Sequence, residues 1–160
     1  MKPQYGLLAG LLAAVLLPAM ADDDEGEGRR LNVPHNAKYK AECASCHMAY
    51  PPQLLPAASW KKLMLGLDKH FGTNAELDAP TQAEISAFLV ASSADANRKA
   101  RPEQASTIRI TETARFQHWH DELSGNVFRR KAVGSAANCV ACHRGAEQGD
   151  FNEHAVRIPR

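Results

Sequence analysis

The sequence predicts an all-α fold, and two observations support this prediction. Apolar residues recur at helical spacing in three segments, residues 57–71, 81–89 and 111–123. No segment shows the strict alternation of apolar and polar residues that indicates a half-buried strand. Aromatic residues make up only 6% of the 160 residues, so we expect a thin hydrophobic core in which something other than side chains fills part of the interior.

The N-terminal residues have the pattern of an export signal. Lys2 precedes an apolar run over residues 7–17, and Ala19-Met20-Ala21 gives the small-x-small pattern that signal peptidase accepts. A membrane anchor is the alternative, but crossing a bilayer takes about 20 apolar residues and Pro18 interrupts this run. We therefore expect residues 1–21 to be a cleavable signal peptide and the protein to be soluble once they are removed.

The residues after the predicted signal divide into a leader and a domain. Residues 22–35 contain five acidic residues and no hydrophobic periodicity, so we expect a flexible acidic leader. Residues 36–160 form the single predicted domain. The formal net charge of the chain is +1, and the only dense basic cluster is the run from Arg129 to Lys131. A cluster this short is typical of a solvated face, so no nucleic-acid partner is expected.

Two helices are expected on either side of a proline-rich turn. The first is a short helix over residues 36–48, which Pro51 and Pro52 end. The second spans residues 57–71, because its apolar side chains follow the i, i+3, i+4, i+7 pattern. These apolar side chains are Trp60, Leu63, Met64, Leu67 and Phe71. His70 lies beside this apolar face, and Gly72 follows as a stop signal.

Three further helices are expected downstream. The capping-box pattern from Thr81 to Glu84 predicts the start of a third helix, with a buried face made by Ile85, Phe88 and Leu89. Residues 92–107 are polar and are expected to form a connection. The fourth helix is expected over residues 111–123, with one face formed by Phe116, Trp119, His120 and Leu123. Ser135 is the expected N-cap of a last short helix that ends at Gly145.

The four cysteines form two copies of one pattern. Cys43, Cys46 and His47 make the first C-x-x-C-H sequence, and Cys139, Cys142 and His143 make the second. This is the pattern of covalent haem attachment. The spacing lets both thiols add to the two vinyl groups of one porphyrin, and the next residue, His, then lies under the iron as the proximal ligand. The sequence therefore predicts a small c-type cytochrome whose helices and long loops wrap around two covalently bound haems.

Three other uses of the cysteines explain less of the pattern. A zinc site with four thiolate ligands or two structural disulfides would give no reason for a His after each pair. A thioredoxin-like redox pair would need one C-x-x-C near a βαβ pattern, which is not found here. Two C-x-x-C-H sequences behind an export signal, with no cysteine left over, therefore favour two haem c groups.

The remaining histidines and methionines decide the sixth ligand of each iron. Met48 directly follows the proximal ligand His47, so it cannot reach the far face of that haem. Met64 is expected in the core, so neither methionine is predicted as a ligand. His70 and His120 each lie at the edge of an apolar helical face, so we predict these two as distal ligands. His118 is the alternative to His120 and lies about 160° away around the helix axis. We prefer His120 because Phe116 lies one turn before it.

The other two histidines, His35 and His154, are expected to be exposed. Sequence proximity favours His70 with the first motif and His120 with the second. Imidazole on both sides of an iron lowers the reduction potential relative to thioether ligation and leaves no open site for a substrate. These properties favour electron transfer by two low-potential, bis-His haems over catalysis, and the chain is not expected to be an enzyme.

The chain resembles the bacterial dihaem cytochrome c family known as DHC. The resemblance is carried by residues 42–60 and 66–72 around the first motif. It continues in residues 137–143, 149–151 and 157–159 around the second. It implies a periplasmic, bis-histidine dihaem electron carrier, with His47 and His143 as proximal ligands and His70 and His120 as distal ligands. The additional His118 departs from the family pattern.

The resemblance also implies redox partners. The family is associated with a small oxygen-binding monohaem cytochrome, sphaeroides haem protein, to which it donates electrons, and an upstream membrane donor is expected to supply them. Two alternatives keep one iron open or its ligand displaceable: a peroxidase-like haem enzyme and a gas-binding module. The enzyme needs a larger chain for a substrate cavity and a distal acid/base residue, and the sequence offers no obvious catalytic pair.

Overall fold

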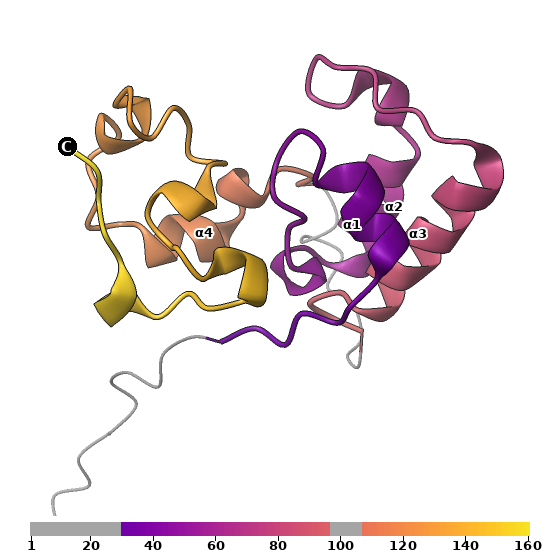
Figure 1. Cartoon of the computed structure of the whole chain (residues 1–160), viewed down its shortest axis with the longest axis horizontal. Coiled ribbons are helices and arrows are strands. Elements are labelled where there is room, and N and C mark those ends of the chain that lie inside the picture. The colour runs from indigo at the N-terminus through magenta and orange to yellow at the C-terminus, as the bar shows by residue number, and fades with distance from the viewer. Residues whose placement is uncertain (1–29, 97–106) are drawn as a thin grey trace, which may run out of the picture.

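The computed structural model describes residues 30–96 and 107–160. The predicted signal peptide, residues 1–21, and most of the predicted leader, residues 22–35, lie outside the described residues, as does most of the predicted connection. The described part is helical and contains no strand, which confirms the predicted all-α class. Its residues form two halves that lie side by side (Figure 1), the first made by residues 30–96 and the second by residues 107–160.

The α-helices are α1 (Ala37–Cys43), α2 (Ala57–Met64), α3 (Ala79–Ala91) and α4 (Ala114–Trp119). The first half also contains the 3-10 helices η1 (Pro52–Leu54) and η2 (Leu67–Lys69). The second half contains η4 (Ile110–Glu112), η5 (Val127–Arg129), η6 (Cys139–Ala141), η7 (Ala146–Gln148) and η8 (Glu153–Ala155). None of the helices in the described ranges has the length and apolar composition that a bilayer crossing requires.

Two predicted helices of the first half are shorter in the structure. Helix α1 starts after the N-cap Asn36, whose side chain accepts a hydrogen bond from the backbone N–H of Tyr39. It ends at Cys43 instead of residue 48, because the chain turns there to present the first motif. Helix α2 ends at Met64, and η2 then carries the chain to His70. The prediction that Phe71 joins the apolar face was wrong, since its φ of 51° turns the backbone out of the helix and its side chain is 42% exposed.

The start of α3 also differs from the prediction. Its N-cap is Asp78, not Thr81, and the Asp78 carboxylate accepts a hydrogen bond from the Thr81 N–H at 3.0 Å. Pro80 fits in the first turn of this earlier start, where a backbone N–H has no helical partner to lose. Ile85 and Leu89 are buried as predicted.

The second half has less regular helix than predicted. Thr113 caps α4 by accepting a hydrogen bond from the Phe116 N–H. The helix ends at Trp119, short of the predicted end at residue 123, and His120 is its C-cap residue. The predicted last helix with Ser135 as N-cap is reduced to the short η6, and its N-cap is Asn138.

The hydrophobic core lies in the first half, where α2 packs against α3. Its buried members are Tyr39, Leu55, Trp60, Met64, Leu67, Ile85 and Leu89. The Trp60 indole N–H donates to the Pro52 carbonyl at 2.7 Å, which satisfies its buried polar group. In the described second half the buried hydrophobic residues are Phe116, Val127, Val133 and Ala146. Apolar side chains therefore fill much less of the second half than of the first.

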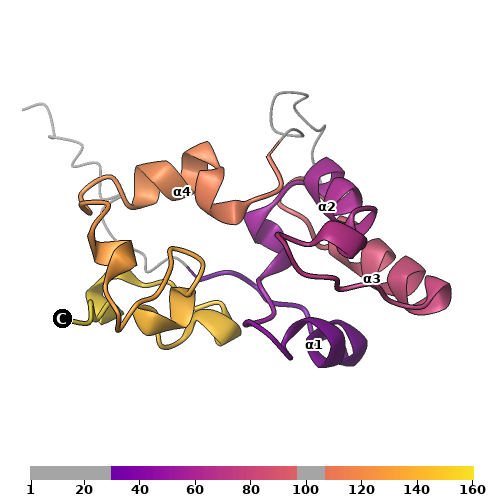
Figure 2. The same cartoon turned by 90° about the horizontal axis from the view of Figure 1, so that it is seen from above.

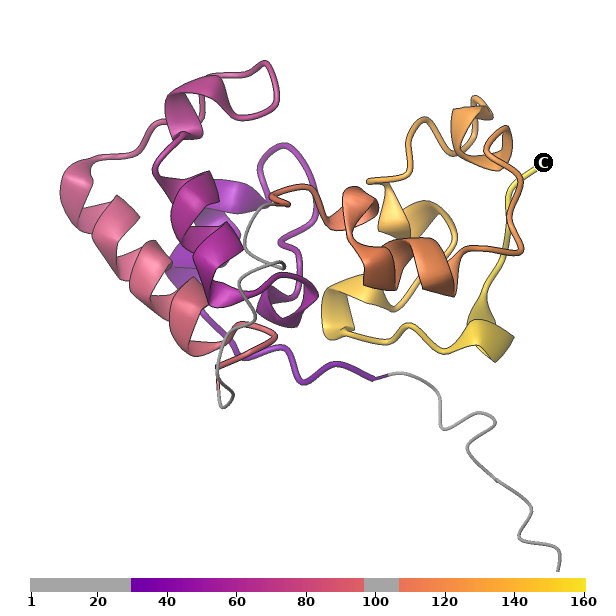
Figure 3. The ribbon, with the colours of Figure 1, turned by 180° about the vertical axis from the view of Figure 1, so that it is seen from behind.

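Hydrogen bonds join the two halves, which lie next to each other in the views from above and behind (Figures 2 and 3). The Tyr50 hydroxyl of the first half donates to the Ala137 carbonyl of the second at 2.8 Å. The Arg115 guanidinium of the second half donates to the Gln53 carbonyl at 2.5 Å. Residues before α1 run beneath both halves, and the Leu31 N–H donates to the Gly149 carbonyl at 2.8 Å.

Candidate metal centres

The first half brings two histidine rings close together. His47 follows the turn after α1, and His70 follows η2. Their ring centres are 6.1 Å apart, and the ring planes differ by 30°. The Nδ1 atom of His47 lies 2.6 Å from the Met48 carbonyl oxygen. An N–H at Nδ1 donating to that carbonyl leaves Nε2 with a free lone pair, the form of imidazole that binds a metal.

The second half contains a matching pair. His120 follows α4, and His143 ends the second C-x-x-C-H motif. Their ring centres are 6.2 Å apart, with the planes nearly perpendicular at 88°. The Nδ1 atom of His120 lies 2.8 Å from the Phe116 carbonyl oxygen, and the Phe116 ring stacks on the imidazole at 4.1 Å between centres. Both contacts fix the orientation of the ring.

The spacing within each pair fits one metal ion between two imidazoles. Bonds between zinc and imidazole nitrogen are about 2.0–2.1 Å long, and we use this length for a metal–imidazole bond. The centre of an imidazole ring lies about 1 Å behind the bonded nitrogen. Two rings on opposite sides of one ion therefore have centres about 6 Å apart. The observed separations of 6.1 and 6.2 Å match this distance. A difference in ring-plane angle is compatible with the fit, because each imidazole can rotate about its metal–nitrogen bond.

Two imidazoles alone do not hold a metal ion, so further donors are needed. In the part of the chain that the structure describes, no group of three or more His, Cys, Asp and Glu side chains could hold a metal ion. A porphyrin would supply four nitrogen donors of its own, so that each histidine pair could complete the donor set. The four cysteines are also all unpaired. The donor set therefore fits two haems and does not provide a four-thiolate zinc site.

The cysteines of both motifs lie in short turns or at the end of a helix. Cys43 is the last residue of α1, and Cys46 lies in the turn before His47. In the second motif the backbone N–H groups of Cys142 and His143 both donate to the Cys139 carbonyl, at 3.2 and 2.8 Å. This compact turn brings Cys142 and His143 back toward Cys139.

Burial shifts the thiols and imidazoles toward their neutral forms. It raises the pKa of the Cys43 and Cys139 thiols to about 11. Burial also lowers the pKa of His70, and nearby His47 and Arg109 lower it further. Burial, followed by nearby His120, lowers the pKa of His143, while Asp150 opposes the shift. A neutral imidazole can offer its lone pair to iron, so these environments favour ligation at neutral pH.

A cavity in the second half adjoins the second histidine pair. It has a volume of about 570 Å³, and Cys139, Cys142, His120 and His143 are among its lining residues. The Phe116 and Phe128 rings and the Val133, Val156 and Ile158 side chains give it an apolar wall. Pockets for cofactors have volumes of about 300–1,000 Å³ and mostly apolar linings with a few polar groups. The thin side-chain core of this half is therefore explained if a haem completes it.

The other histidines lie away from both pairs. His118 is exposed, and its Nδ1 atom is 3.7 Å from an Asp121 carboxylate oxygen. His35 and His154 are exposed, as the sequence predicted. Met64 is buried in the core, also as predicted.

Several aromatic and charged neighbours of the pairs were not predicted. The Tyr50 ring stacks on His47 at 4.7 Å between centres, and Phe151 lies 5.3 Å from His143. The Arg109 guanidinium lies 4.1 Å from the centre of the Phe71 ring, beside His70. Tyr50 lies three residues after His47, and this closeness to the motif was the one sequence signal for its contact with the site. Arg109 is distant from both motifs in the sequence, so no sequence signal pointed to its position beside His70.

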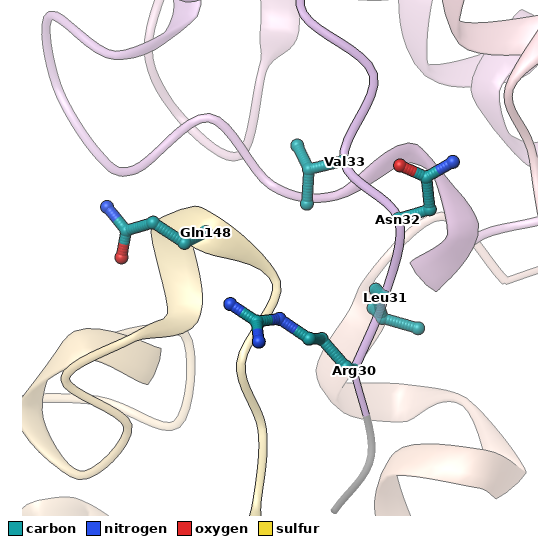
Figure 4. A pocket seen from close by; sticks show the side chains of 5 residues that line it. All are labelled: Arg30, Leu31, Asn32, Val33 and Gln148. Atoms are coloured by element: carbon teal, nitrogen blue, oxygen red, sulfur yellow. The ribbon is translucent and has the colours of Figure 1, made fainter.

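A second pocket lies where residues 30–33 pass the second half (Figure 4). It is lined by Arg30, Leu31, Asn32, Val33 and Gln148. It contains neither a cysteine nor a histidine, so it is not a candidate for haem chemistry.

Comparisons with known proteins found a matching family and similar solved structures. The sequence model of the family described as dihaem cytochrome c matches residues 39–151. A search of curated proteins found no match. A solved structure of the dihaem cytochrome c from Rhodobacter sphaeroides is 38% identical with a TM-score of 0.67, and the match covers 76% of this chain and 100% of that one. A dihaem c-type cytochrome from Shewanella baltica OS155 is 41% identical with a TM-score of 0.68, over 79% of this chain and 95% of that one.

Proposed function

Because this chain belongs to the dihaem cytochrome c family, we propose that it transfers electrons through two haems, each held between two imidazoles. The observation that carries the proposal is the facing histidine pair in each half, with ring centres 6.1 and 6.2 Å apart. His47 and His70 would hold one haem, and His120 and His143 the other. The thioether bonds would come from Cys43 and Cys46 and from Cys139 and Cys142.

The side chains of each site hold and orient the imidazoles. A bound haem supplies the one-electron exchange between ferric and ferrous iron. The hydrogen bonds from Nδ1 of His47 and His120 to backbone carbonyls fix the ring orientation and make the free nitrogen more basic. The Phe116 ring stacks on His120 and the Phe128 ring meets it edge-on, so apolar surface lies against that imidazole.

A haem held between two imidazoles would favour electron transfer over catalysis at the iron. A substrate or gas could bind only after a histidine leaves, and both His120 and His47 are held by a second contact to the backbone. Two nitrogen ligands also favour the ferric state more than a histidine and a methionine do, so the proposed reduction potentials are low.

The proposed location is the periplasm, and the signal-like pattern over residues 1–21 supports it. The proposed electron acceptor is a small oxygen-binding monohaem cytochrome, supported by the resemblance to the family. A membrane-bound donor would supply the electrons.

The test uses the mature protein purified with its cofactors. We expect the intact mass to contain two porphyrins, and the ferric electron paramagnetic resonance spectrum to contain only low-spin haem. We also expect neither carbon monoxide binding by the reduced protein at neutral pH nor peroxide turnover. A high-spin signal from one haem together with fast carbon monoxide binding would replace the proposal with an open-site function, and a mass without porphyrin would remove it.

A further inference from the structure

Tyr50 lies at the contact between the two halves and touches a histidine of the first pair. Its ring stacks on His47 with 4.7 Å between centres and 29° between planes. Its hydroxyl donates a hydrogen bond to the Ala137 carbonyl of the second half at 2.8 Å, although the two residues are 87 positions apart. The Tyr39 hydroxyl donates to the Tyr50 carbonyl at 2.8 Å, so the backbone of Tyr50 is tied to the core of the first half.

The acceptor of this hydrogen bond belongs to the second motif segment. Ala137 lies two residues before Cys139, and the Cys139 sulfur lies 3.6 Å from the same carbonyl oxygen. A continuous series of contacts therefore joins the two sites. It runs from the His47 ring to the Tyr50 ring, through one hydrogen bond to the Ala137 carbonyl, and then through two residues of backbone to Cys139.

The other hydrogen bonds described between the halves join different parts of the chain. Arg115 donates to the Gln53 carbonyl, and Leu31 donates to the Gly149 carbonyl. Neither bond has a histidine of the two pairs or a cysteine as donor or acceptor. These bonds hold the halves together, whereas the Tyr50 contact also connects one site to the other. Stacked rings and hydrogen bonds are the kind of contiguous contact through which two sites influence each other.

We propose that Tyr50 is a positioning residue that connects the two haem sites, and that electrons pass between the halves along its contacts with His47 and Ala137. The inference rests on the proposed function, because it requires a haem in each half. The step moves one electron: one site is oxidised and the other is reduced. No bond forms or breaks, and the Tyr50 hydroxyl keeps its proton.

Two substitutions separate the ring from the hydroxyl. Tyr50→Phe keeps the stacking on His47 and removes the hydrogen bond to Ala137, while Tyr50→Leu removes both. Tyr39→Phe is the matched control, because it also removes one tyrosine hydroxyl hydrogen bond from the first half but leaves Tyr50 in contact with His47 and Ala137. The rate of electron exchange within the half-reduced holo-protein is measured from the line widths of the haem methyl signals in proton nuclear magnetic resonance spectra. Exchange within one molecule is identified by its independence of protein concentration.

We expect Tyr50→Phe to slow this exchange, because it loses the hydrogen bond to Ala137, and Tyr50→Leu to slow it further, because it also loses the ring contact with His47. Tyr39→Phe should exchange at the wild-type rate. The reduction potential of each haem and the melting temperature are measured for all variants, because a merely structural role of Tyr50 would change these quantities instead of the rate.

Wild-type exchange rates in both Tyr50 variants, with two low-spin haems still present, would overturn this inference and leave the proposed function intact. Equal slowing by Tyr39→Phe would also overturn it, because the effect would then come from loosening of the first half. Absence of two low-spin haems from the wild-type protein would instead remove the proposed function, and the inference with it.

Discussion

Replacing His120 tests the second site most directly, because His118 offers a built-in comparison two residues away. In the structure His120 faces His143 with 6.2 Å between ring centres, whereas His118 is exposed beside Asp121. We expect His120→Ala to convert one of the two haems to high spin and to leave the other unchanged, since His47 and His70 lie in the other half. Half of the low-spin ferric signal should therefore disappear. His118→Ala should leave the whole low-spin signal in place.

The fold should survive both substitutions. His120→Ala removes the hydrogen bond to the Phe116 carbonyl and the ring stacking on Phe116. These contacts contribute about 1 kcal/mol and about 0.5–1.5 kcal/mol, so a loss of roughly 2 kcal/mol is expected, in addition to the lost metal bond. The exposed contact between His118 and Asp121 contributes at most about 1 kcal/mol.

The assay is quantitative electron paramagnetic resonance of the ferric proteins, with haem content measured on the same samples. Imidazole added to the His120→Ala protein should restore the low-spin signal, because it can occupy the position that the side chain vacates. The reasoning would be refuted by a fully low-spin His120→Ala protein without added imidazole. It would equally be refuted if His118→Ala lost half of the low-spin signal.

Three further predictions concern stability. Burial raises the pKa of Tyr39 above its ordinary value near 10, so the unfolded chain loses this proton first. The contribution of Tyr39 to the free energy of unfolding should therefore fall by up to about 1.4 kcal/mol per pH unit above about pH 10. Urea titrations between about pH 9 and 11 should show a shallower total fall for Tyr39→Phe. Gly149→Ala should destabilise the protein and release residues 30–33, because φ is 77° at Gly149 and a Cβ atom would lie 2.2 Å from the Leu31 carbonyl oxygen. Hydrogen exchange at the Leu31 amide should then speed up. An unchanged exchange rate would contradict the packing of residues 30–33 against Gly149. Ile85→Ala should lower the free energy of unfolding by about 2–5 kcal/mol, because the side chain is fully buried in the core. A decrease below about 1 kcal/mol in chemical denaturation would show that the core around Ile85 is less tightly packed.

Local patterns predicted the parts of the protein that depend on neighbouring residues. The spacing within each C-x-x-C-H motif predicts both proximal histidines and all four attachment cysteines, because the pattern describes one turn of chain against one porphyrin. Helical periodicity likewise located α2, α3 and α4, although the ends were less accurate. Thr81 has the residue type of an N-cap, but its own backbone N–H donates a hydrogen bond to the Asp78 carboxylate. Asp78 is therefore the N-cap, and α3 starts earlier than predicted.

Contacts between distant residues were decided by the tertiary structure. Periodicity placed His70 beside an apolar face but could not show that the chain leaves the helix after Met64 and brings His70 opposite His47. No local pattern could show that His120, and not the exposed His118, contacts the Phe116 carbonyl and lies near His143. Tyr50 and Ala137 are 87 positions apart, so no local pattern could predict the hydrogen bond between them.

The sequence by itself therefore determined the helical class, the two attachment motifs and the set of histidines from which the axial positions could come. The tertiary structure decided which histidines face each other and how the two halves make contact. The physical reason is that helix formation and covalent attachment depend on residues within one or two turns of chain. The opposition of two imidazoles depends on packing between segments up to some tens of residues apart, and that packing leaves no periodic trace in the sequence.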